Sequence, residues 1–299
     1  METVESLRRK ISGAKELLSV VKTMKALAAV SIRQIEKAVH SLAAYDRTVQ
    51  QGLQMVVHSA PQVLAPPSPA RSGRSLAVVL GSDQGLVGRF NEMVAGYARD
   101  QMELRGLSEQ SWTIWAVGIR AETQLERLGC RVSERFAAPS SINSIQSVVQ
   151  QILPRMEAWR AEDKNERVSL IFNHTASGSF IQPRRIPLLP LDREWLRSLA
   201  LKKWPHRVLP TFTMGLAPLL AALVRQHLSV TLYRTVAQSL AAENAGRLAA
   251  MQVAEKNISE RLDELQAAFH QQRQSAITEE LLDVISGFEA LTGDTRHGD

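Results

Sequence analysis

The sequence is almost free of cysteine. Cys130 is the only one in 299 residues, so an intrachain disulfide and a cysteine-based metal site are both excluded. Such a chain fits a reducing compartment. The seven histidines show none of the HxH or HExxH spacings that bind zinc. The sequence therefore indicates neither a disulfide framework nor a metal centre.

Long apolar runs and concentrated charge are also missing. No apolar run approaches the roughly 18 residues that a transmembrane helix needs, and the N-terminus is charged from Glu2 onward, without the apolar segment of a signal peptide. The formal net charge of +6 is spread along the chain, and no Lys/Arg run carries interleaved aromatics. A solvated basic surface is favoured over nucleic-acid binding, and nothing in the sequence forbids docking onto a membrane complex.

What the sequence does have is two long helical segments. Aromatic residues make up only 5% of the chain, which suits long helices better than a β-sandwich. In residues 1–59 one row of positions recurs at alternating steps of four and three, and this period predicts a coiled-coil helix with a left-handed supercoil. Lys25 and Asp46 are the two polar interruptions. The row comprises Leu7, Ile11, Ala14, Leu18, Val21, Lys25, Ala28, Ile32, Ile35, Val39, Leu42, Asp46, Val49, Leu53 and Val56.

The C-terminal segment carries a second row of this kind. No proline occurs from Ser239 to Leu291, and about fifty residues at roughly 1.5 Å each make a rod of about 75 Å that needs a partner along its length. The rhythm shifts after Ala276, so the last turns should pack differently from the rest. The row comprises Leu248, Met251, Glu255, Ile258, Leu262, Leu265, Phe269, Gln272 and Ala276, and its shifted continuation Ile277, Leu281, Val284 and Phe288.

The middle of the chain has a different character. Residues 60–74 hold four prolines and are typical of a linker. Strand-like and helix-like segments then alternate, which predicts a small Rossmann-like α/β domain with a mostly parallel sheet over residues 75–209. We expect strands at 75–80, 111–117, 130–136, 166–175 and within 180–191, and helices up to about 106, at 120–128 and at 141–160.

The predicted fold class is therefore α/β with a coiled coil. The helix of residues 1–59 and the C-terminal helix and short tail of residues 210–299 form a long antiparallel two-helix coiled coil, which carries the α/β domain at one side. This arrangement is the economical one, because each long helix supplies the partner that the other needs.

The most site-like segment is GSDQGLVGRFNEM, which spans residues 81–93 between a predicted strand and a predicted helix. Gly81, Gly85 and Gly88 form neither a GxGxxG nor a GxxxxGK[ST] motif. A tight turn, in which glycine permits positive φ and close packing, is favoured over nucleotide binding. His174 follows a predicted strand end without a nucleophile motif and is interpreted as a surface residue.

Polar residues on the two long helices form the other candidate group. Lys25, beside Met24, either fixes the register of the coiled coil at a cost in stability or faces a third surface. On the C-terminal helix the candidates are Arg247, Arg273, Gln274, Thr278, Glu280 and Asp283. From the residues alone, a solvated helix face is the simpler interpretation.

Four segments together resemble the gamma subunit, or central rotor shaft, of F-type ATP synthases. They are LRRKISGAKELLSVVKTMKALAAVSIRQIEKA, SDQGLVGRFN, AAENAGRLAAMQVAEKN and RQSAITEELLDVISG, and they occur in that family's order. Val87 and Arg89 stand where the family usually has Cys and Gly, Phe269 and His270 where it has Tyr and Asn, and Phe288 where a small residue is usual. The chain resembles a divergent member.

The resemblance implies a non-catalytic subunit without a cofactor. The coiled coil would be an asymmetric shaft inside a ring of three alpha and three beta subunits, and the α/β domain would grip the epsilon subunit and the membrane c-ring. Ion flow, of H⁺ or Na⁺, would turn ring and shaft and drive the beta sites through different affinities. The residues that would meet the beta subunits are Met24, Lys25, Arg247, Arg273, Gln274, Thr278, Glu280 and Asp283.

The absence of an Arg- and Ser-rich, acid-poor leader favours the cytoplasmic face of a bacterial plasma membrane over an organelle. Two other readings of the sequence remain. One is a coiled-coil scaffold or tether whose α/β domain binds a partner protein. The other is a stand-alone α/β enzyme, which would show a ligand-dependent change in the fluorescence of Trp112 or Trp115.

Overall fold

The computed structural model describes residues 3–60, 74–104, 112–163, 167–175, 180–204 and 210–293, with side chains up to residue 286. The chain divides into two compact units. One is formed by Met1–Ala26 and Ala250–Asp299, and the other is Leu27–Ala249. Two long helices, α1 (Val4–Ser59) and α6 (Leu216–Gly293), contribute residues to both units.

The larger unit contains a five-stranded sheet with the order β3-β2-β1-β4-β5. The first four strands of this order run parallel, and β5 pairs antiparallel with β4. Pro183 and Pro187 both lie in β5, which suits a strand at the edge of the sheet because proline donates no ladder hydrogen bond. The strands are β1 (Ser75–Leu80), β2 (Trp112–Val117), β3 (Glu134–Phe136), β4 (Arg167–Thr175) and β5 (Ile181–Leu189).

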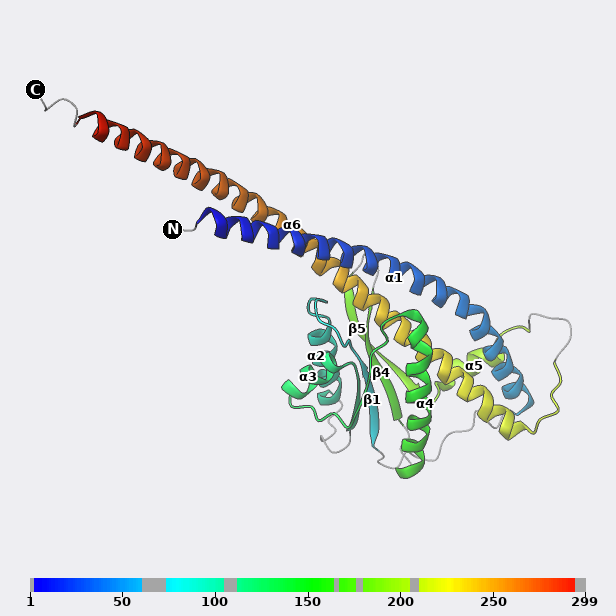
Figure 1. Ribbon diagram of the computed structural model, residues 1–299. Coiled ribbons are helices and arrows are strands. Elements are labelled where there is room, and N and C mark those ends of the chain that lie inside the picture. The colour runs from blue at the N-terminus through cyan, green and yellow to red at the C-terminus, as the bar shows by residue number, and fades with distance from the viewer. Residues whose placement is uncertain are drawn as a thin grey trace, which may run out of the picture. The chain divides into compact units, whose positions relative to one another are not determined.

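Helices cover both faces of the sheet (Figure 1). The α/β class, the mostly parallel sheet and the two terminal helices that were predicted are confirmed. One further helix, α5, was not predicted. The short helices are α2 (Phe90–Glu103), α3 (Ile119–Arg127), α4 (Ile142–Asp163) and α5 (Arg193–Leu201).

Helix α5 has a start signal that the sequence analysis passed over. The Asp192 side chain accepts hydrogen bonds from the backbone N–H groups of Glu194 (2.9 Å) and Trp195 (3.4 Å), as an N-cap residue does. Leu196 and Leu199, three residues apart, then bury one face of the helix. The sequence pattern gave no prediction for this segment, because nine residues carry little periodicity.

The central strand β1 is buried on both faces, as its unbroken apolar run predicts. Leu76, Val78 and Leu80 face a cluster that includes residues of α1, α4 and α6, whereas Ala77 and Val79 face a second cluster with α2. Successive strand residues point to opposite faces, so this one strand joins both layers. The long helices of the larger unit therefore share a core with the sheet.

Within the larger unit, α1 and α6 run antiparallel. Gly52 lies against Leu223, and Asp46 forms an ion pair with Arg234, at 3.2 Å between Oδ2 and Nη1, so residue numbers fall along one helix as they rise along the other. None of the fifteen row positions predicted on α1 is exposed. The predicted seam of the N-terminal helix is thus confirmed.

Both polar interruptions of the α1 seam find an opposite charge on α6. Lys25 pairs with Glu255 in the smaller unit, and Asp46 pairs with Arg234 in the larger one. Twenty-one residues, or three heptads, separate Lys25 from Asp46, and the same number separates Arg234 from Glu255. The two pairs therefore share one antiparallel register, and of the two interpretations of Lys25 the structure supports register fixing.

The seam of α6 ends where the sequence rhythm shifts. Leu265 is buried and Ala276 is half-buried, but every side chain described from Ile277 to Ser286 is exposed. The exposed side chains include Leu281, at 57% of its surface, and Val284, at 65%. The prediction that the last turns pack differently is confirmed, while Phe288 lies outside the described side chains.

The division into segments 1–59, 60–74, 75–209 and 210–299 stays a prediction. Most of the proposed linker, residues 61–73, lies outside the described residues. Across the described helices, no stretch is both long enough and apolar enough to cross a bilayer.

Arg234→Leu should lower the free energy of unfolding by about 2 kcal/mol, because it leaves the Asp46 carboxylate buried without its cation. Asp46→Leu combined with Arg234→Leu should recover most of this loss, since an apolar pair suits the seam. Urea unfolding measures both variants. Lys256→Leu, which breaks the exposed pair with Glu260, is the control and should cost less than about 0.5 kcal/mol. A double variant less stable than Arg234→Leu would contradict the prediction.

Candidate functional site

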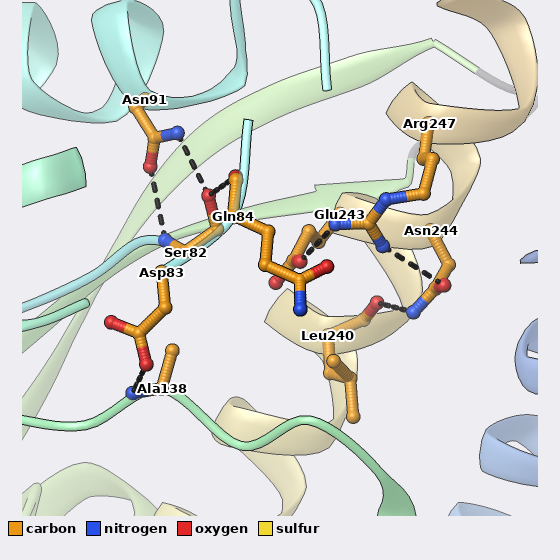
Figure 2. Close-up of polar contacts among 9 residues, drawn as sticks. All are labelled: Ser82, Asp83, Gln84, Asn91, Ala138, Leu240, Glu243, Asn244 and Arg247. Atoms are coloured by element: carbon orange, nitrogen blue, oxygen red, sulfur yellow. Dashed lines mark hydrogen bonds and ion pairs between the residues drawn. The ribbon is translucent and has the colours of Figure 1, made fainter. Parts of the chain in front are cut away.

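The candidate site lies in the larger unit, where the loop after β1 meets helix α6. The loop leaves the carboxyl end of β1, and Figure 2 shows its polar contacts. The backbone N–H of Ser82 donates to Oδ1 of Asn91 (3.0 Å), and Nδ2 of Asn91 donates to Oγ of Ser82 (2.8 Å). Oγ of Ser82 in turn donates to the backbone oxygen of Gln84 (2.9 Å). The loop is therefore closed on itself and tied to the first turn of α2.

Asp83 ties the same loop to two other segments. Its Oδ1 accepts from the backbone N–H of Ile119, and its Oδ2 accepts from the backbone N–H of Ala138, each at 2.9 Å. Ile119 is the first residue of α3, where a carboxylate is favoured by the helix dipole and by the unsatisfied N–H groups. One side chain thus holds the start of α3 and the segment after β3 in place.

The tight-turn interpretation of the glycines is supported at two of the three positions. A Cβ on Gly81 would lie 2.3 Å from Cβ of Ala121, so this site needs glycine for close packing. Gly88 has a φ of +60°, which glycine adopts at little cost. Gly85 shows neither feature, and the other positive φ in the loop belongs to Leu86, at 62°.

The α6 side of the site is a polar cluster of three residues. Nη2 of Arg247 lies 2.7 Å from Oε1 of Glu243, and Nη1 lies 3.3 Å from Oδ1 of Asn244. Nδ2 of Asn244 donates to the backbone oxygen of Leu240 (2.9 Å). The side chains of Glu243 and Arg247 are only 9% and 12% exposed, so this ion pair is largely removed from water.

Burial raises the pKa of the Glu243 carboxyl, and the hydrogen bond and charge of Arg247 oppose that rise. The negative charge of Asp83 adds to the rise. Burying a carboxylate is costly unless a cation and hydrogen bonds offset the lost hydration. Arg247 therefore offsets part of the cost of burying the Glu243 carboxyl.

The loop after β1 and helix α6 approach each other closely at Gly246. A Cβ at this position would lie 2.9 Å from the backbone oxygen of Val87 and 3.1 Å from Cδ1 of Ile181. Val87 also packs in a small buried cluster with Phe90 and Ala242. We call this contact the joint, defined by residues 82–87 of the loop and residues 240–247 of α6. A hollow of about 110 Å³ lies between Asp83, Glu243 and Arg247.

The predicted contact residues fall into two groups. Five of them are exposed on the part of α6 around and beyond the end of the seam. Met24 and Lys25 are half-buried in the smaller unit, and Arg247 lies in the joint of the larger one. The exposed five are Arg273, Gln274, Thr278, Glu280 and Asp283.

Sequence reasoning missed that two of its motifs touch. SDQGLVGRFN and AAENAGR are far apart in the chain, and each was considered separately. In the joint, Val87 of the first motif lies against Gly246 of the second, and Asp83 lines the same hollow as Glu243. The available signal was the density of small and polar residues in both motifs. Among the residues that the structure describes, no group of His, Cys, Asp and Glu could hold a metal ion.

Gly246→Ala should destabilise the protein by about 1–3 kcal/mol, because the added methyl group meets the rigid backbone oxygen of Val87. Gly13→Ala is the matched control in a long helix. Nothing lies within 4 Å of a Cβ there, so alanine should raise stability by about 0.5–1 kcal/mol. Thermal unfolding followed by circular dichroism measures both. Equal effects of the two substitutions would show that the close approach at Gly246 is not a constraint.

The comparisons of this sequence with known proteins all identify the same family. The family model described as ATP synthase matches residues 3–291. The ATP synthase gamma chain of Granulibacter bethesdensis is 28% identical over 304 residues, covering 97% of this chain and all of the relative. The ATP synthase gamma chain of Geotalea uraniireducens is 25% identical over 294 residues, covering 98% and 100%.

Solved structures give the same fold. A chain of the Euglena gracilis mitochondrial ATP synthase, in a structure of OSCP, F1 and c-ring, has a TM-score of 0.62 at 17% identity, covering 99% of this chain and 97% of that one. A chain of the Tetrahymena thermophila mitochondrial ATP synthase, from its central stalk and c-ring, has a TM-score of 0.57 at 19% identity, covering 79% and 99%. At these identities the likeness concerns the fold.

The motifs, the fold and the match over nearly the whole chain agree, and the resemblance predicted from the sequence is confirmed. The chain belongs to the ATP synthase family, as a relative of its gamma chains.

Proposed function

We propose that this chain is the non-catalytic central-stalk rotor subunit of an F-type ATP synthase. It couples ion flow through the membrane c-ring to conformational change at the beta-subunit sites by rotating. The observation that carries the proposal is the end of α6. There the seam stops, and a regular helix continues with its described side chains exposed on every side. A helix with large apolar residues all round is built to be surrounded by other protein.

The joint supports a mechanical role. A rotor must pass torque between its α/β domain and its shaft helix, which requires a stiff contact. In the larger unit, α6 packs against the loop at Gly246 and through the buried cluster of Val87, Phe90 and Ala242. Tightly packed contacts deform little under load. The joint therefore transmits rotation of the domain to α6 with little slip.

The proposed contacts with the beta subunits use both charge and apolar surface. Five polar side chains lie among exposed apolar residues on the end of α6 from residue 273 to residue 286, which we call the bare end. They are Arg273, Gln274, Thr278, Glu280 and Asp283. Met24, Lys25 and Arg247 complete the proposed set from half-buried positions. Because the five polar side chains on the bare end are spread around the helix rather than lined up on one side, rotation presents a different face to each beta subunit in turn.

Further partners follow from the family. We propose that the α/β domain binds the epsilon subunit and the c-ring, and that the shaft lies within the ring of alpha and beta subunits. The complex would act at the cytoplasmic face of a bacterial plasma membrane, which this chain meets only through its partners. The motif match at both ends of the chain supports this assignment.

Reconstitution tests the rotor assignment. ATP hydrolysis by the matching alpha and beta subunits should fall to near background without this chain and recover when it is added. The chain alone should hydrolyse no ATP, since its role is mechanical. Steady-state ATPase assays on the purified subunits measure this. The proposal fails if activity is the same with and without the chain.

The bare end of α6 can be tested without disturbing the fold. Gln274→Ala with Thr278→Ala should lower the ATPase activity of the assembled complex severalfold. Both side chains are exposed and alanine favours helix, so the free energy of unfolding should change by less than about 0.5 kcal/mol. Gln252→Ala, exposed on the same helix where the seam still holds, is the control and should leave activity unchanged. An equal loss of stability and activity in the double variant would mean that these residues are merely structural.

A further inference from the structure

A second hollow lies at the opposite end of the α/β domain from the joint. It has a volume of about 620 Å³ and opens between the last turn of α2, the segment after α3 and the first residues of β2. Ligand sites in proteins commonly have volumes of about 300–1,000 Å³. The hollow is large enough for a small aromatic molecule, whereas the hollow in the joint measures about 110 Å³.

The floor of this hollow is apolar and packs against the protein core. Met102, Trp112, Leu128 and Val132 line it, and all four pack against the buried cluster on that face of the sheet. Ile114, which is 5% exposed, lies in both the cluster and the lining. The floor is therefore an extension of the core, and a flat apolar group could rest on it without rearrangement.

The rim is positively charged. Arg74, Arg99 and Arg131 line the hollow, against one carboxylate, that of Glu103. Nε of Arg99 lies 3.3 Å from Oε1 of Glu103, one turn further along α2, and its Nη2 lies 3.6 Å from Oδ1 of Asp100. Guanidinium groups match the geometry of phosphate and carboxylate oxygens, so the rim favours an anion.

The position is unusual for an open α/β sheet. Ligands of such sheets normally bind at the carboxyl ends of the strands. In this chain Ser82 and Asp83 fill that end with contacts to Asn91, Ile119 and Ala138. The hollow lies at the amino end of β2, so the usual dinucleotide mode does not apply to it.

We propose that this hollow binds a small planar anion, an aromatic or heteroaromatic ring that carries a phosphate or carboxylate group. The ring lies on the floor beside Trp112 and Met102, and the anionic oxygens meet Arg99 and Arg131. The site belongs to the α/β domain alone, and the inference does not depend on the rotor role.

Calorimetric titration of the full chain tests the proposal with defined probes. 1-Naphthyl phosphate and 1-naphthoate carry the two anionic groups, and 1-naphthol is the neutral counterpart. At least one anion should bind about tenfold more tightly than the naphthol. Arg131→Gln should weaken the anion about tenfold, whereas Arg127→Gln, an exposed arginine on α3 outside the lining, should leave it unchanged. Circular dichroism confirms that both variants fold.

Alkylation of Cys130 can report on ligand binding in this hollow. It lines the hollow and is the only cysteine of the chain, so its alkylation by N-ethylmaleimide reports on one site. The bound anion should slow alkylation severalfold, as followed by mass spectrometry, and inorganic phosphate should slow it less. The proposal is overturned if neither anion binds at millimolar concentration, if naphthol binds equally well, if both arginine variants behave alike, or if bound anion leaves the alkylation rate unchanged.

Discussion

The pairing of opposite charges in the helix seam is the constraint on which the arrangement of α1 and α6 depends. An apolar seam tolerates a slip of one heptad, because one aliphatic side chain replaces another at little cost. A charged seam position does not tolerate such a slip, because Lys25 would then lose Glu255 and Asp46 would lose Arg234. Losing a partner is costly for a half-buried charge and more so for a buried one. In one pair the positive residue, Lys25, lies on α1, and in the other the positive residue, Arg234, lies on α6. A register that brought Lys25 to Arg234, or Asp46 to Glu255, would therefore bring like charges together.

A correct register then decides which residues of α6 meet the α/β domain. It brings Gly246 to the loop after β1 and places Glu243 and Arg247 beside that loop's polar network. The loop is stiff because Asp83 and Asn91 hold it to α3, to the segment after β3 and to α2. Seam and joint thus form one mechanical path through the larger unit, and a subunit that rotates needs such a path. The bare end of α6 is where that path would act on other proteins.

Much of this could be predicted from particular patterns. The seam of α1 followed from a four–three rhythm, and the end of the α6 seam from the shift after Ala276. Strand β1 was placed at its observed bounds, because an apolar run between turn residues leaves few alternatives. Helix α5 was missed, since nine residues carry little periodicity and its start depends on one capping residue, Asp192. The contact of Arg247 with the beta subunits stays a prediction, whereas its ion pair with Glu243, one turn away on the same helix, was not predicted.

By itself the sequence determined the two long helices, the α/β domain between them and the family, because periodicity and motifs are local properties that a single chain carries. Only the tertiary structure decided that Lys25 meets Glu255 and Asp46 meets Arg234, that α6 passes close to the loop at Gly246, and that three arginines gather around Trp112. These contacts join residues that lie far apart in the chain. They depend on packing between elements, which no local pattern encodes, because the same apolar rows are compatible with several registers and only the folded core selects one.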